Sequence, residues 1–228
     1  ALAAGMPASK AHRYLVSLIR SGLVEQDRLT SRYDLGPFAL NLGLVALDRI
    51  DRIRLGLTAI TDLRDETNET VSLTVWSDAG PVVVRWERPR RLITVNVVTG
   101  THLSLLRSAG GRVFAAWLPE RQTEALIRRE LETGKAPAGV TTVDEARALL
   151  AKVREAGLAV IADDDYFARG VEAAAAPVFN FKNEITMAIA IVGVEGTMDL
   201  APDGPTLGAL RRTANDLSRR LGATLEQG

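Results

Sequence analysis

The sequence contains no cysteine. Without a thiol, the chain can form no disulfide, no thiolate metal site and no cysteine nucleophile. Nothing at its beginning resembles a signal peptide, and a reducing compartment is compatible with the missing thiols. The longest apolar runs, residues 173–179 and 185–194, are too short to cross a bilayer. We therefore expect a cytoplasmic protein without membrane contact.

The sequence also lacks net charge, because 28 basic residues balance 28 acidic ones over 228 residues. Such a chain does not bind nucleic acid by overall charge. Residues 1–36 nevertheless carry five basic and three acidic residues, a local excess of two positive charges. Hydrophobic residues make up 46% of the chain, which excludes long disorder and is enough for a sizeable core. At this length we expect two domains.

Catalytic patterns are missing as well. The two histidines, His12 and His102, stand in no metal-ligand or triad-like pattern. Residues 108–112 contain two glycines, but they lack the glycine spacing and the lysine followed by serine or threonine of a phosphate-binding loop. We predict that the protein is not an enzyme and requires neither a metal nor a cofactor.

Residues 1–36 have the pattern of a helix followed by a hairpin. Glycine and proline before small and basic residues predict a helix that begins near Pro7. One face of this helix is apolar and is expected to be buried: Ala11, Leu15, Leu18 and Ile19. After a stop at residues 21–22, residues 23–27 and 31–35 are expected to pair across a short polar tip. A helix followed by a hairpin is the back half of a winged helix-turn-helix.

The remainder of the chain predicts a linker and a larger domain. Residues 38–51 form a helix that is apolar almost all round, typical of burial between domains or subunits, or of an ordinary core helix. Helices are expected at residues 53–66, 109–118, 119–131, 142–156 and about 205–225, and strands at 69–77, 81–87, 92–98, 158–162, 171–181 and 185–194. Antiparallel hairpins flanked by helices favour an α+β fold over a doubly wound sheet.

Three segments carry a family resemblance: residues 5–15 (Gly-Met-Pro-Ala-Ser-Lys-Ala-His-Arg-Tyr-Leu), 21–27 and 31–37. They resemble the recognition helix and wing of the IclR-type bacterial transcriptional regulators, and the match continues to the last helix. The front of the DNA module is absent, so the chain opens inside the turn before the recognition helix. The resemblance implies a winged helix-turn-helix DNA-binding domain at 1–36, a linker helix at 37–52 and a GAF-like effector-binding domain at 53–228.

DNA contact then requires the helix after Pro7 to lie in a major groove. The residues expected nearest the duplex are Ser9, Lys10, His12, Arg13 and Ser17, with Arg32 of the wing toward the backbone. Arg13 is the best candidate for reading a guanine edge. Because one module reads a short half-site, we expect a homodimer or a dimer of dimers on double-stranded operator DNA. The alternative is a small-molecule-binding or dimerisation module with a vestigial DNA-binding part.

Two places are candidates for effector contacts. Asp163 opens a run of three aspartates that is typical of a solvated loop or a cation site, and the resemblance places Asp163 where some members orient a small effector. The turn at Ala109 and Gly110 starts a helix, where exposed N–H groups favour an anion. Close packing of a helix on a sheet explains the same small residues equally well.

Departures from the family pattern predict the chemistry of the pocket. Ala173 stands where a cysteine is frequent, and Ala190 and Val192 stand where serines are frequent. Leu106 replaces a histidine, so the metal donors of some relatives are missing. We expect a pocket drier and roomier than one built for a two- or three-carbon keto acid, suited to an aromatic or otherwise apolar effector with one polar end near Gly110 or Asp163.

Overall fold

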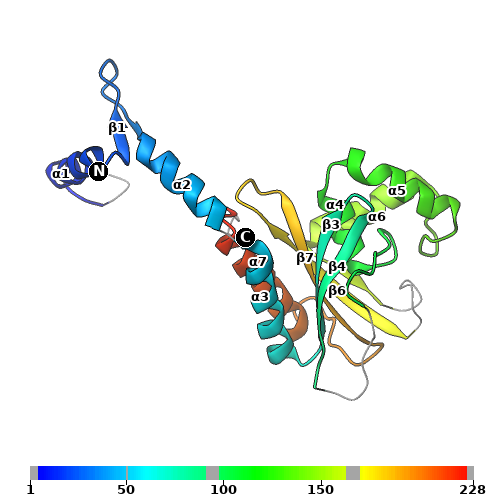
Figure 1. Cartoon of the computed structure of the whole chain (residues 1–228). Helices are drawn as coiled ribbons and strands as arrows, with labels where there is room; N and C mark the ends of the chain where they lie inside the picture. Colours follow the sequence, from blue (N-terminus) through cyan, green and yellow to red (C-terminus); the bar gives the residue numbers. More distant parts are fainter. Residues whose placement is uncertain (1–4, 50, 91–97, 163–169, 225–228) are drawn as a thin grey trace. The chain divides into compact units, whose positions relative to one another are not determined.

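The computed structural model describes residues 5–49, 51–90, 98–162 and 170–224. The chain divides into two compact units, Ala1–Asp51 and Arg52–Gly228. Figure 1 shows the elements of each unit, coloured along the sequence. No helix in the described ranges is long and apolar enough to cross a membrane.

The first unit consists of α1 (Ala8–Arg20), β1 (Val24–Gln26), β2 (Tyr33–Leu35) and α2 (Pro37–Arg49). β1 and β2 pair antiparallel, which confirms the predicted hairpin. The hairpin leads directly into α2, because Gly36 N–H donates to the Leu23 carbonyl at 2.9 Å and Phe38 N–H donates to the Gly22 carbonyl at 3.0 Å. A Cβ atom on Gly36 would lie 2.3 Å from the Gly22 oxygen, so this close approach requires glycine.

The second unit is built on a five-stranded antiparallel sheet. In spatial order its strands are β4 (Gly80–Glu87), β3 (Thr70–Ser77), β7 (Ile185–Val194), β6 (Val171–Phe179) and β5 (Ala159–Ile161). β6 and β7 are buried on both faces over most of their length, as uninterrupted apolar runs favour. The predicted α+β fold is confirmed. The strand expected at 92–98 lies, except for residue 98, outside the described residues.

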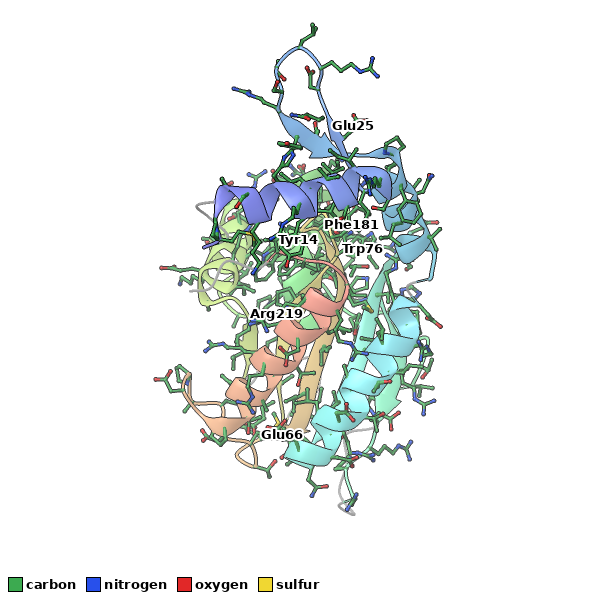
Figure 2. The ribbon with its side chains drawn as sticks, turned by 90° about the vertical axis from the view of Figure 1, so that its left-hand side faces the viewer. Tyr14, Glu25, Glu66, Trp76, Phe181 and Arg219 are labelled. Carbon is green, nitrogen blue, oxygen red and sulfur yellow. The ribbon has the colours of Figure 1, made fainter. Side chains whose placement is uncertain are left out.

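Two helices cover one face of the sheet, α3 (Arg52–Thr67) and α7 (Pro205–Arg220). Figure 2 shows them side by side in front of the sheet, with Glu66 labelled at the end of α3. Glu66 forms an ion pair with Arg212 of α7 at 2.6 Å. Five apolar residues at helical spacing are buried: Leu207, Leu210, Ala214 and Leu217 of α7, and Leu221 directly after it. The helix ends at Arg220, and residue 225, its expected end, lies outside the described residues.

Three helices cover the opposite face: α4 (Ala109–Trp117), α5 (Glu120–Glu132) and α6 (Val143–Ala156) (Figure 1). α4 packs on β6 and β7 and is buried along almost its whole length. The strand residues in this part of the core are small: Ala173, Ala175, Ala188 and Ala190. Small side chains under a helix that begins Ala-Gly-Gly allow its first turn to come close to the sheet.

A capping box starts α6, and acidic residues stand in its first turn. The Glu145 N–H donates to the Thr142 hydroxyl at 3.2 Å, and the Glu145 carboxylate accepts from the Thr142 N–H at 3.0 Å. Hydrogen bonds from Thr141, backbone first, and then from Thr142 lower the pKa of Glu145. Gly157 ends the helix with a φ of 74°, which favours glycine.

Replacing Thr142 with alanine should lower the free energy of unfolding of the complete chain by about 1 kcal/mol, because one N–H of the first turn loses its acceptor. Chemical denaturation followed by circular dichroism measures the difference. Thr142→Ser is the matched control and should retain most of the stability. Equal stability of the alanine variant and the wild type would show that this cap contributes nothing.

Candidate functional site

The polar face of α1 carries the predicted DNA contacts. All of these residues are exposed: Ser9, Lys10, His12, Arg13, Ser17 and, before β2, Arg32. Lys10, Arg13 and Ser17 are separated by three and four residues, so they project from one face. The Ser17 hydroxyl donates to the Arg13 carbonyl at 3.2 Å, which turns its proton toward the helix backbone. Among the predicted DNA contacts on this face, Lys10 and Arg13 are the charged ones.

The apolar face of α1 is less covered than expected. Ala11 and Leu15 are half-buried, while Leu18 and Ile19 are each 37% exposed. No residue of α1 is buried. The prediction of a buried stripe is wrong for this chain, because a hairpin of two three-residue strands offers too little surface to cover a helix.

The tip of the hairpin is ordered by Asp27. Its Oδ1 accepts from the N–H groups of Leu29 at 2.7 Å and Thr30 at 2.8 Å. These bonds, Thr30 first and Leu29 second, lower the pKa of Asp27. The ionised form therefore holds the turn, and its contribution is lost only as the pH falls through this lowered pKa. This turn leads to Arg32, the wing residue expected near the DNA backbone.

The apolar residues of α2 remain on the surface of the chain. Exposed fractions of 49–65% are found for Phe38, Leu40, Leu42, Leu44 and Val45. The expectation that this helix is an ordinary core helix is wrong for these five residues, because the first unit does not bury them. Burial against the second domain or against another subunit stays a prediction.

Five of the six predicted effector-binding residues line one small hollow at the start of α4: Ala109, Gly110, Ala173, Ala190 and Val192. Ala173 of β6 and Val192 of β7 are direct partners in the sheet. Asp163, the sixth, lies outside the described residues. The volume of the hollow is about 10 Å³, room for about one water molecule. The expectation of a roomy pocket is therefore wrong for this structure.

Leu103 explains the small volume. Its side chain lines the hollow, and its Cδ1 lies 3.4 Å from the place that a Cβ atom on Gly110 would take. The hollow is also less apolar than expected, because Ser72, Trp86 and Ser108 contribute to its wall. Leu103 thus occupies the space in front of Gly110, in a hollow that has both polar and apolar lining residues.

Two buried polar atoms have no hydrogen-bond partner in the described ranges: Trp86 Nε1, whose residue lines the hollow, and Thr74 Oγ1, which lies near Gly110 but outside the lining. Thr74 is completely buried, and its Oγ1 lies 3.6 Å from the Cβ position of Gly110. An unpaired buried group costs about 1–3 kcal/mol, so a ligand or water that binds both atoms would be stabilised here. Sequence reasoning missed Thr74 and Trp86, because polar residues that alternate along a strand are equally typical of a solvent-facing side. It missed Leu103, because a leucine in a loop is an ordinary residue.

The two neighbouring glycines of α4 have different roles. Gly111 N–H donates to the Ser108 hydroxyl at 2.9 Å, and a Cβ atom on Gly111 would lie 1.9 Å from the Ser104 carbonyl oxygen. Close packing therefore requires glycine at position 111. Gly110 faces the hollow, where a Cβ atom would make only ordinary contacts. The close approach at Gly111 is to the loop before α4 and not to the sheet, so the helix-on-sheet interpretation and the ligand interpretation of this turn both stay predictions.

The loop before α4 is held in place by Glu130 of α5. Its Oε1 accepts from Leu105 N–H at 2.7 Å, and its Oε2 accepts from Ser104 Oγ at 2.8 Å and Leu106 N–H at 3.0 Å. Leu106 is completely buried. In the described ranges no group of three histidine, aspartate or glutamate residues is placed to hold a metal ion.

The structure combines a helix that has a basic exposed face, a hairpin beside this helix, and a separate domain with helices on both faces of an antiparallel sheet. This combination is typical of the class of two-domain DNA-binding transcriptional regulators. Comparisons with known proteins place the chain more narrowly.

Residues 1–28 match the model of the IclR helix-turn-helix domain, and residues 45–219 match the model described as bacterial transcriptional regulator IclR C-terminal. The glycerol operon regulatory protein of Streptomyces griseus is 32% identical over 231 residues, which cover 96% of this chain and 85% of that protein. The transcriptional repressor IclR of Escherichia coli is 27% identical over 192 residues, 83% of this chain and 69% of that protein. The crystal structure of Pseudomonas aeruginosa HmgR has 40% identity and a TM-score of 0.85, with 96% of this chain and 86% of that chain covered.

The chain belongs to the IclR family of bacterial transcriptional regulators. The predicted family is thereby confirmed, and with it a regulator that binds DNA through a helix-turn-helix domain. Family membership indicates a regulator rather than an enzyme.

Proposed function

We propose that α1 and the β1–β2 wing bind operator DNA in the cytoplasm, and that a small organic effector bound at the start of α4 changes the affinity for that DNA. The observation that carries the effector site is the hollow beside Gly110, which Trp86 lines and near which Thr74 lies; Trp86 Nε1 and Thr74 Oγ1 are buried without a partner among the described residues. Ligand pockets in proteins typically combine apolar walls with a few such polar groups.

The proposed DNA-binding form is a homodimer or a dimer of dimers. One helix and wing read a short half-site, so a near-palindromic operator needs two copies. The exposed apolar residues of α2 support this proposal, because Leu40 and Leu44, one helical turn apart, present an apolar face that a second copy would cover.

The proposed effector has an aromatic or otherwise apolar body. Val83, Ala190 and Val192 give the hollow an apolar side, and Leu103 must move before a molecule larger than water can enter. An effector that binds more tightly to one arrangement of the dimer shifts the affinity for DNA by the same ratio, since coupling between two sites is reciprocal.

The proposal is tested by fluorescence anisotropy of the complete protein on DNA from its own promoter region. Benzoate and phenylacetate should change the dissociation constant for DNA by about 5- to 150-fold, the usual range of such coupling. Glyoxylate and pyruvate should have no effect. An effect of the keto acids alone would contradict the aromatic effector, and an unchanged affinity with every acid would contradict regulation at this site.

Serine substitutions in the hollow give a second readout. Ala173→Ser and Val192→Ser should weaken binding of the aromatic acid by about 1–2 kcal/mol, because each places a hydroxyl in the wall that the apolar body covers. Ala174→Ser is the matched control, since Ala174 is equally buried on β6 but alternates to the other face of the sheet. Calorimetry measures the affinities, and unchanged affinity of both variants would contradict the proposed pocket.

A further inference from the structure

A second hollow lies outside the loop that leads into α4, between this loop and α5. Its volume is about 590 Å³, within the range of 300–1,000 Å³ typical of small-molecule sites. Leu103 and Leu126 supply apolar surface, and most of the remaining wall is polar or charged. It is therefore large enough for an organic ligand, which the hollow beside Gly110 is not.

Basic side chains line this outer hollow from different elements. Arg107 comes from the loop, Arg129 from the last turn of α5 and Lys135 from the segment after α5. The Lys135 N–H donates to the Glu130 carbonyl at 2.8 Å, which folds the chain back against the end of α5. Within the described ranges, Arg129 and Lys135 form no ion pair.

Glu130 is the acidic residue among the described residues of this wall, and its carboxylate is already engaged. The oxygens accept three hydrogen bonds from the loop, two from backbone N–H groups and one from the Ser104 hydroxyl. Its charge is directed at the loop rather than at Arg129 or Lys135. The outer hollow is accordingly a basic site.

Cations at the end of a helix also complement its macrodipole, so the charge by itself does not require a ligand. Leu103 provides the independent observation. It lines both hollows, and its Cδ1 fills the space in front of Gly110. The same Cβ position of Gly110 lies 3.6 Å from the buried hydroxyl of Thr74, which has no partner in the described part of the chain. One leucine side chain thus borders both the basic hollow and the Gly110 position, next to a polar group that has no partner among the described residues.

We propose that the two hollows are halves of one effector site, and that the effector is a carboxylic acid. Its carboxylate binds Arg129 and Lys135 in the outer hollow, and its apolar body displaces Leu103 to reach Gly110 and Thr74. Arginine suits this role, because its guanidinium forms two parallel hydrogen bonds with a carboxylate. This inference rests on the proposed function and adds to it the charge of the effector and the residues that select it.

The test is calorimetric titration of the complete chain with three probe acids of increasing length, benzoate, phenylacetate and 3-phenylpropionate, and with the neutral amide of each. At least one acid should bind, and its amide should bind at least about tenfold more weakly, since charged hydrogen bonds are about twice as strong as neutral ones. Arg129→Gln and Lys135→Gln should each raise the dissociation constant of the acid about tenfold. Leu103→Ala should lower the dissociation constant of the acid, because it removes the side chain that the effector must displace.

The neighbouring Arg128 gives a matched control. It is an exposed arginine on the same helix, it pairs with Glu124 at 2.6 Å, and it does not line the outer hollow. Arg128→Gln should leave the dissociation constant unchanged. The inference is overturned if Arg129→Gln behaves like Arg128→Gln, if acid and amide bind equally, or if no acid binds.

Two further results separate this inference from the proposed function. If Thr74→Val weakens acid binding while Arg129→Gln and Lys135→Gln do not, the effector lies wholly in the inner hollow, and the proposed function stands without the outer half. Inorganic phosphate that binds as tightly as the acids would assign the outer hollow to a free anion and would overturn the inference.

Discussion

Gly111→Ala should destabilise the second unit by about 3 kcal/mol or more, whereas Gly110→Ala should change its stability by less than about 1 kcal/mol. A methyl group on Gly111 would stand 1.9 Å from the Ser104 carbonyl and 2.8 Å from Leu105 Cα, both backbone atoms. The loop that forms both hollows would have to move. The methyl group on Gly110 would stand 3.4 Å from Leu103 Cδ1 and 3.6 Å from Thr74 Oγ1, at ordinary contact distances.

The two alanine variants separate folding from ligand binding. The methyl group of the Gly110→Ala variant would fill the space beside Thr74. The Gly110→Ala variant should therefore keep the wild-type melting temperature and lose the response of DNA binding to aromatic acids. Thermal unfolding and anisotropy on the same preparations measure both properties. A stable Gly111→Ala variant would contradict the packing of the loop, and a fully responsive Gly110→Ala variant would contradict the site.

Arg13→Ala should weaken binding to operator DNA by about 1–3 kcal/mol, which is about 5- to 150-fold, if Arg13 reads a guanine edge. The side chain is exposed in the second turn of α1, on the face that also carries Lys10. Anisotropy titrations at several salt concentrations measure the affinity and its salt dependence.

Arg13→Lys distinguishes the two roles that an arginine can have on DNA. Lysine keeps the charge but loses the planar fork, so a base contact should be largely lost and a phosphate contact largely kept. Lys10→Ala should instead weaken specific and non-specific DNA to a similar degree and reduce the salt slope by about one. Undiminished binding of Arg13→Ala to the operator would contradict its predicted role.

Much of the secondary structure could be predicted from local patterns. The hairpin of β3 and β4 follows from two alternating runs around a short turn, and α6 is bounded by the Thr142 cap and by Gly157. These signals lie within a few residues of the elements that they specify. The end of β6 was harder to predict, because Asn180 stops the strand with its side chain: Oδ1 accepts from Lys182 N–H at 2.8 Å and Glu184 N–H at 3.1 Å.

The candidate site was predicted in part. Gly110, Ala173 and Val192 are far apart in the sequence, and the family resemblance brought them together. Thr74 and Leu103 carried no such signal, since a threonine in a strand and a leucine in a loop are ordinary residues. The size of the hollow could not be predicted either, because it depends on where the Leu103 side chain points.

The sequence by itself determined the local elements, the basic face of α1, the family and the small residues around Gly110. These properties depend on spacing and residue type, which the chain carries wherever it folds. Only the tertiary structure decided that Leu103 lines two hollows and that Gly111 lies close to the Ser104 carbonyl. It also decided that Thr74 Oγ1 and Trp86 Nε1 are buried without partners among the described residues. These properties depend on distances between segments that are remote in the sequence, and such distances are fixed only when the helices pack on the sheet.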